Sequence, residues 1–146
     1  MVAVASESWA GLGPAEILER SKVLAVVGCS RRPWKAAHEV PEALQRRGYR
    51  IIPVHLTADE ILGERVYRTL ADIGQPIDTV VVFRPSPECA GVAKAAIAAG
   101  ARAVWLQLGL SNAEARRAVE AAGMGYVEDL CSKVVAAKHG IRAAAA

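Results

Sequence analysis

Apolar residues occur along this chain in short continuous runs rather than in one long block. Five runs lie at residues 23–27, 49–54, 78–83, 103–106 and 125–128, and most of them are rich in Val, Ile or Leu. Runs without strict alternation are typical of parallel strands that helices cover on both faces. We therefore expect five strands, with the ladder of the second one ending at Pro53 because proline has no N–H to donate.

The segments between these runs have the composition of helices. We expect a lead-in helix at 14–21, helices at 36–47, 87–99 and 112–122, a short helix at 67–73 and a last helix at 130–138. Gly48, Gly100 and Gly123 follow the three long helices, where glycine commonly ends a helix. This alternation predicts an α/β fold: a Rossmann-like, doubly wound, mostly parallel five-stranded sheet with helices on both faces.

The length of 146 residues suits one domain and is too short for two. We expect a single domain at 13–140, between a flexible N-terminal segment at 1–12 and a flexible tail at 141–146. No apolar run is long enough to span a bilayer and the first residues lack the cations of a secretory signal, so we expect a cytoplasmic protein without a membrane partner. Cys29, Cys89 and Cys131 stand singly, which argues against a zinc site or a disulfide framework.

Candidate chemistry gathers in the loop after the first run. The net charge is only +3 and the basic residues are dispersed, which argues against a nucleic-acid partner and suits a small anionic ligand. The loop contains Gly28, Cys29, Ser30, Arg31, Arg32 and Lys35, directly before a helix. A permissive glycine, a hydroxyl and three cations at a helix N-terminus are suited to a pyrophosphate.

Ordinary NAD binding is disfavoured by the same region. The loop lacks the G-x-G-x-x-G pattern. The second strand ends in Pro53, Val54 and His55, where a nicotinamide-nucleotide domain has an acid for the ribose hydroxyl.

Four segments of the sequence resemble one family. They are VLAVVGCSRRPWKAAHEVPEALQRRGYRIIPV from residue 23, DTVVVFRP from residue 78, GARAVWLQLG from residue 100 and EDLCSKVVAAKHG from residue 128. Together they look like the bacterial CoA-binding proteins with a Rossmann fold, which are similar to the CoA-binding domain of the succinyl-CoA synthetase α subunit. The similarity runs from about residue 23 to residue 139, and it implies coenzyme A or an acyl-CoA as the ligand.

The resemblance also implies a set of binding residues. Gly28, Cys29, Ser30, Arg31 and Arg32 would wrap the pyrophosphate, with Lys35 as a further cation. Arg50 would meet the 3'-phosphate, Pro53 and Val54 would border the adenine and ribose, and His55 is the preferred titratable contact. Phe83 and Arg84, with Gln107 and Gly109, would line the path of the nucleotide or the pantetheine arm. The chain departs from the family in having His55-Leu56 within PVHL instead of PVNP, Trp34 instead of a small residue, and Leu130 instead of an Arg.

The residues supply phosphate-binding loops without a recognisable set of nucleophile, general base and oxyanion donors. The leading hypothesis is therefore non-catalytic binding of CoA or an acyl-CoA, for sensing, carriage or regulation. Two alternatives stay open: an acyl-CoA transferase or thioesterase that uses Cys29 or His55, and a module for NADP or another nucleotide in which Arg50 reads a 2'-phosphate. A homodimer through the Ala-rich helices, or a separate partner protein, also stays open, and no metal ligand is assigned.

Overall fold

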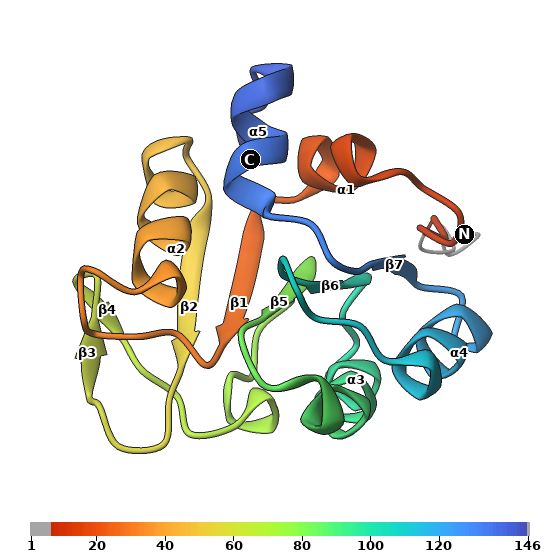
Figure 1. Cartoon of the computed structure of the whole chain (residues 1–146), viewed down its shortest axis with the longest axis horizontal. Coiled ribbons are helices and arrows are strands. Elements are labelled where there is room, and N and C mark those ends of the chain that lie inside the picture. The colour runs from red at the N-terminus through yellow and green to blue at the C-terminus, as the bar shows by residue number, and fades with distance from the viewer. Residues whose placement is uncertain (1–6, 146) are drawn as a thin grey trace, which may run out of the picture.

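The computed structural model describes residues 7–145, and five parallel strands form its central sheet (Figure 1). They are β1 (Val23–Val27), β2 (Arg50–Val54), β5 (Thr79–Val82), β6 (Ala103–Leu106) and β7 (Gly125–Val127), in the order β2-β1-β5-β6-β7. All five expected strands are present, and the α/β fold class is confirmed.

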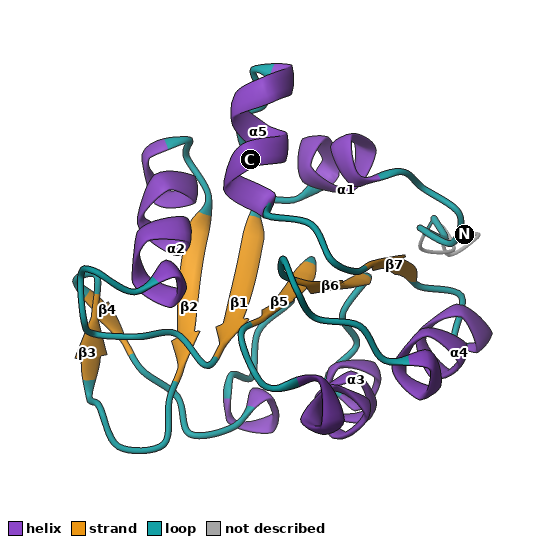
Figure 2. Ribbon diagram, viewed as in Figure 1, coloured by secondary structure: helices purple, strands orange, loops and turns teal. Residues whose placement is uncertain are grey.

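Helices cover both faces of this sheet, as Figure 2 shows. One face carries α1 (Pro14–Arg20), α2 (Ala36–Arg46) and α5 (Ser132–His139). The other carries α3 (Cys89–Ala98), which follows the 3-10 turn η2 (Ser86–Glu88), together with α4 (Ala113–Ala121) and the 3-10 turn η1 (Leu70–Asp72). Among residues 7–145, no helix is long and apolar enough to cross a bilayer.

Side chains from alternate positions of each strand enter the two cores, as strand geometry requires. Leu24 and Val26 of β1 belong to the core under α1, α2 and α5, whereas Ala25 of the same strand belongs to the core under α3 and α4. Trp105 of β6 is fully buried in the first core, and its indole N–H donates to the carbonyl oxygen of Leu130 at 2.8 Å. Trp105 is therefore a core residue.

The expectation that the second ladder ends at Pro53 is wrong. Pro53 pairs with Val26 in the parallel register, and the ladder continues to Val54 opposite Val27. Because β2 is the edge strand and the Pro53 carbonyl accepts from Tyr67 on the outer side, an N–H at residue 53 would also have pointed away from β1. Proline at an outward-facing edge position removes no bond of the sheet.

The connection from β2 to β5 also differs from the expected short helix at 67–73, which is reduced to η1. Ahead of it lies a small antiparallel hairpin of β3 (Glu60–Ile61) and β4 (Glu64–Arg65), which Figure 1 shows beyond the β2 edge. Leu62 and Gly63 form its turn with φ of 55° and 74°. Strands of two residues leave no periodicity in a sequence, so the hairpin could be read only as a loop.

The N-terminal segment was expected to be loose up to residue 12, but residues 7–12 pack on the domain. Trp9 is buried, and the Arg102 guanidinium lies over its ring at 5.2 Å from the centroid. Arg102 also donates to the carbonyl oxygen of Glu7 at 2.9 Å, and the Ser8 hydroxyl donates to that of Gly123 at 2.8 Å. The expectation for residues 1–6 lies outside the described residues.

The C-terminal segment is likewise fastened to the domain through residue 144. Ile141 is buried in the core under α1, α2 and α5. The N–H groups of Ala143 and Ala144 donate to the carbonyl oxygens of Arg47 and Ser21 at 3.0 and 2.9 Å. Residues 141–144, which were expected to form a flexible tail, thus lie against the domain in this structure, and residue 146 lies outside the described residues.

Candidate functional site

The strand order places a switch point between β1 and β5. The chain passes from β1 outward to β2, then returns to the opposite side of β1 to form β5. In open parallel sheets, ligands bind at such points because the loops after the two strands diverge and leave a crevice at the carboxyl edge. A cleft of about 950 Å³ lies here, and it is lined by the loops after β1, β2 and β5, by η1 and by one side of α3. Its volume is in the range of small-molecule and cofactor sites.

Gly28 ties the three loops together at the floor of this cleft. Its N–H donates to the carbonyl oxygen of Val54 at 3.1 Å, and its φ is +83°. A Cβ at this position would lie 2.5 Å from the carbonyl oxygen of Phe83 and 3.1 Å from Cδ of Arg84. Both the left-handed backbone and the close approach of β5 therefore require glycine.

The loop from Gly28 to α2 is ordered by its own hydrogen bonds. The Ser30 N–H donates to the carbonyl oxygen of Ala37 at 3.0 Å, and the Arg32 N–H donates to the Ser30 hydroxyl at 3.1 Å. The His38 imidazole donates through Nδ1 to the Ser30 carbonyl oxygen at 2.7 Å. These bonds hold the loop against the first turn of α2, so Ser30, Lys35 and Ala37 all line the cleft.

The N-terminus of α2 lies in this cleft without a capping side chain. Its N-cap is Lys35, which makes no side-chain cap hydrogen bond. A helix N-terminus has a positive partial charge and unpaired N–H groups, so a cation there is unfavourable in the absence of an anion. The first turn of α2 is therefore suited to bind an anion, although a cation at its N-cap does not stabilise the helix itself.

Three cations of this loop have no acidic partner within the described part of the chain. Arg31, Arg32 and Lys35 are exposed and form no salt bridge there. The fourth cation of the site, Arg84, is paired with Glu88 at 2.9 and 3.0 Å. The positive charge of the loop after β1 is thus uncompensated, whereas that of Arg84 is largely balanced.

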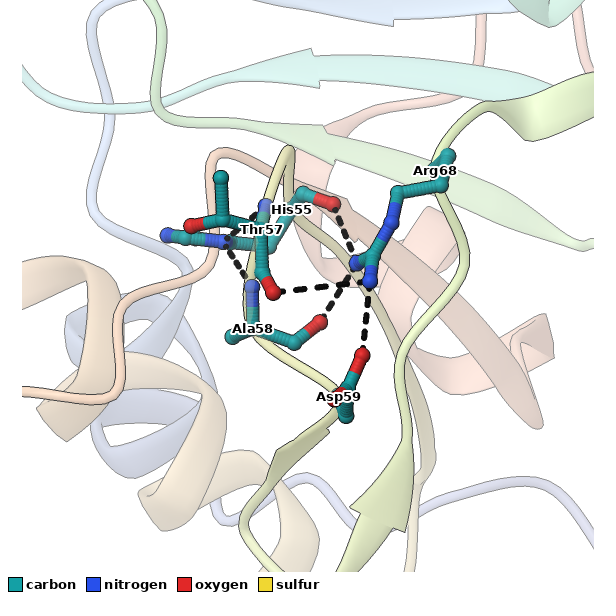
Figure 3. Close-up of polar contacts among 5 residues, drawn as sticks. All are labelled: His55, Thr57, Ala58, Asp59 and Arg68. Atoms are coloured by element: carbon teal, nitrogen blue, oxygen red, sulfur yellow. Dashed lines mark hydrogen bonds and ion pairs between the residues drawn. The ribbon is translucent and has the colours of Figure 1, made fainter.

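His55 follows β2 and lines the cleft with its ring fixed by backbone donors (Figure 3). The N–H groups of Thr57 and Ala58 donate to its Nδ1 at 3.1 and 2.9 Å. Because Nδ1 accepts, the neutral ring carries its proton on Nε2. Partial burial, followed by the charges of Arg31 and Arg68, lowers the pKa of His55 below its ordinary value. The site therefore contains a neutral imidazole with one N–H donor.

Arg68 fastens the same turn from the other side, as Figure 3 shows. Its guanidinium donates to the carbonyl oxygens of His55 and Ala58 at 3.2 and 2.5 Å and forms an ion pair with Asp59 at 2.7 Å. Arg68 also lines the cleft. The sequence prediction missed this residue, because it lies in an aperiodic segment and reaches the site only through the β3–β4 hairpin.

Cys29 lies in the cleft wall but is not suited to be a nucleophile. Its side chain is fully buried, and burial raises the pKa of the Cys29 thiol to about 12, opposed only in part by a backbone hydrogen bond from Ser30. A thiol reacts as the thiolate, so this cysteine is almost wholly unreactive near neutral pH. Cys29 fills the turn as a small apolar residue.

Most of the predicted site residues meet in one place. The cleft is lined by Gly28, Cys29, Ser30, Lys35, Val54, His55, Phe83 and Arg84. Arg31 and Arg32 belong to the same loop but do not line the hollow itself, and Pro53 precedes the lining residue Val54.

Three predicted residues lie elsewhere. Arg50 begins β2 and pairs with Val23, so it stands at the amino edge of the sheet, about 13 Å of strand away from Val54. Gln107 is buried, and its amide exchanges two hydrogen bonds with Ser132 at the start of α5. The Gly109 N–H donates to the Asp129 carboxylate at 2.7 Å, outside the cleft.

Comparison with known proteins agrees with this architecture. The family model described as "CoA binding domain" matches residues 22–137. The chain belongs to this CoA-binding domain family. The resemblance inferred from the sequence is thereby confirmed.

Some of the similar proteins have nearly the same length as this chain, and another is a much larger enzyme. The "Uncharacterized protein YneT" of Bacillus subtilis (strain 168) is 46% identical over 119 residues, which are 82% of this chain and 88% of YneT. A hypothetical protein from Pyrococcus horikoshii OT3 superposes with a TM-score of 0.82 at 29% identity, covering 93% of this chain and 98% of that chain. A dinucleotide-forming acetyl-coenzyme A synthetase of Ca. Korarchaeum cryptofilum, in complex with phosphate and ADP, superposes with a TM-score of 0.69 at 26% identity. The match covers 78% of this chain but only 27% of that synthetase, so the fold recurs there as one part of a larger enzyme.

Proposed function

We propose that this protein binds coenzyme A or an acyl-CoA in the cleft between β1 and β5, in a sensing, carrying or regulatory role without catalysis. The observation that supports this most is the uncompensated positive charge of Arg31, Arg32 and Lys35 at the uncapped N-terminus of α2. Membership of the CoA-binding domain family gives the ligand class.

Coenzyme A carries negative phosphate groups that would balance the positive charge of this loop. Its pyrophosphate would accept from the first N–H groups of α2 and from Lys35, since charge-assisted bonds to phosphate are among the strongest that side chains make. Its 3'-phosphate requires further cations, and Arg50 stands at the opposite edge of the sheet. Arg31 and Arg32 are therefore the residues we assign to that phosphate.

An acyl-CoA enzyme built on this chain alone is less well supported. The Cys29 thiol is buried with a pKa of about 12, and the Nδ1 atom of His55 is already occupied by two backbone donors. A general base needs a free lone pair within reach of the proton that it abstracts. Neither residue supplies an activated nucleophile or a base in this arrangement.

An NADP module is also less well supported. At the carboxyl end of β2, where such a domain recognises its ribose, this chain has Val54 and His55. Arg50, the residue considered for a 2'-phosphate, lies at the other end of that strand. We infer a coenzyme with a pyrophosphate but without a contact from Arg50.

Isothermal titration with CoA, 3'-dephospho-CoA, NADP and ATP tests this proposal. We expect CoA to bind most tightly and Lys35→Ala to weaken it about tenfold or more, because a hydrogen bond to a charged group contributes roughly 1.5–3 kcal/mol. Lys138→Ala is the matched control, since Lys138 is an exposed cation at the far end of α5. No heat with CoA up to millimolar concentration, or equal losses in the two variants, would contradict the proposal.

The state of the cysteines bears on the cellular compartment. Cys29, Cys89 and Cys131 are all free thiols. Unpaired cysteines are usual in the reducing cytoplasm. We propose that the protein works there.

A further inference from the structure

A second hollow adjoins the cleft on the other side of the Phe83–Arg84 segment. It has a volume of about 470 Å³ and lies between the first turn of α2 and the loops after β5 and β6. Lys35, Ala37, Phe83 and Arg84 line both hollows. The two hollows are therefore adjacent, and both border the first turn of α2, where we place the pyrophosphate.

The second hollow is apolar away from this shared boundary. Its further lining includes Val40, Pro85, Leu108, Leu110 and Cys131. Leu108, which is 70% exposed, is one of these lining residues.

The one buried polar side chain in this lining, Gln107, bonds to the protein itself. Gln107 donates through Nε2 to the Ser132 hydroxyl at 2.8 Å and accepts at Oε1 from the Ser132 N–H at 3.1 Å. These bonds hold the amide against Ser132 at the start of α5 and use one of its N–H donors and one of its oxygen lone pairs. The hollow thus offers apolar contact with little side-chain hydrogen bonding.

This lining distinguishes between the parts of an acyl-CoA. The pantetheine arm carries two amides, which lose free energy when they are buried without partners. A hydrocarbon chain needs no partners and gains from every methylene removed from water. We propose, on the basis of the function inferred above, that the second hollow holds the apolar acyl group of an acyl-CoA thioester, so that the protein prefers acyl-CoA to free CoA.

Affinity as a function of acyl length is the first test. In titrations with CoA and its acetyl, butyryl, hexanoyl and octanoyl thioesters, we expect about two- to fourfold tighter binding per added methylene until the hollow is full. Leu108→Ser should reduce the preference for octanoyl-CoA over CoA at least threefold and leave the affinity for CoA unchanged. Val134→Ser is the matched control, because Val134 is 59% exposed on α5 and lines neither hollow.

The chain also contains a reporter inside the second hollow. Cys131 is partly exposed there, whereas Cys29 and Cys89 are buried. Labelling of native protein with N-ethylmaleimide should therefore occur at Cys131 and vanish in Cys131→Ser. We expect octanoyl-CoA at saturation to slow this labelling at least tenfold, and desulfo-CoA, which has no thiol to consume the maleimide, to slow it much less.

The outcomes separate this inference from the proposed function. Binding of CoA with no gain for any acyl thioester, or equal protection of Cys131 by desulfo-CoA and octanoyl-CoA, would overturn the acyl site and leave CoA binding intact. If neither CoA nor any thioester binds, both proposals are wrong. Length-dependent affinity that Leu108→Ser reduces, with protection of Cys131 by octanoyl-CoA, supports the acyl site.

Discussion

An alanine at residue 28 should destabilise this protein for two separable reasons. Gly28 has φ of +83°, where an L side chain costs about 1–2 kcal/mol. The new Cβ would also lie 2.5 Å from the carbonyl oxygen of Phe83, and forcing an extra carbon into a packed site costs typically about 1–3 kcal/mol. We expect Gly28→Ala to lower the free energy of unfolding by about 2–5 kcal/mol in total.

Gly100→Ala is the control that isolates the steric part. Gly100 also has a positive φ, of +75°, but a Cβ there meets nothing within 4 Å. Urea unfolding followed by tryptophan fluorescence measures both variants, and the extra steric cost at residue 28 should lower the midpoint by a further ~1 M, given slopes of about 1–3 kcal/mol per M. Equal midpoints for Gly28→Ala and Gly100→Ala would refute the argument that the carbonyl of Phe83 closes on the loop after β1.

Three further predictions concern charge, pH and the N-terminal segment. Glu88→Gln should tighten CoA binding about two- to fivefold in titration calorimetry, because it frees Arg84 from an exposed ion pair of roughly 0.2–1 kcal/mol; an unchanged affinity would mean that Arg84 does not meet the ligand. The lowered pKa of His55 means that its contribution to stability is complete above the ordinary pKa of about 6.5 and is lost as the pH falls through that value toward the folded-state pKa. Urea midpoints at pH 7 and pH 5 should therefore differ less in His55→Gln than in the wild type, and an identical difference would exclude this role. Trp9→Ala should cost about 3–5 kcal/mol of unfolding free energy if the ring is buried as in the structure, and a loss below 1 kcal/mol would show that the segment is loose in solution.

The fold could be predicted from the sequence because its strands are buried on both faces. Continuous apolar runs such as residues 79–82 have no other common explanation when glycine-ended helices alternate with them. The errors arose where local signals were weak or misleading. A proline such as Pro53 is normally taken to end strand pairing, and only the position of β2 at the sheet edge shows that it does not. Trp9 packs against Arg102, which is 93 residues away in the sequence, so its position could not be predicted from local signals.

The candidate site could be predicted only as far as it is local in sequence. Gly28 to Lys35 form one loop, so their types and order indicate an anion site by themselves. Arg50 was assigned to the same site by resemblance, but a strand of five residues carries it to the opposite edge of the sheet. Arg68 reaches the cleft only through tertiary structure, and no pattern in the sequence marks it. The second hollow depends on how the first turn of α2 packs beside the loops after β5 and β6, and a single sequence does not specify that packing.

A crystal structure of the protein with coenzyme A tests the central claim most directly. The account predicts pyrophosphate density at the first turn of α2, within hydrogen-bonding distance of Lys35 and the Ser30 loop, with Glu88 still outside the phosphate shell. Coenzyme bound at any other surface, or a cleft that stays empty at saturating coenzyme, would contradict it.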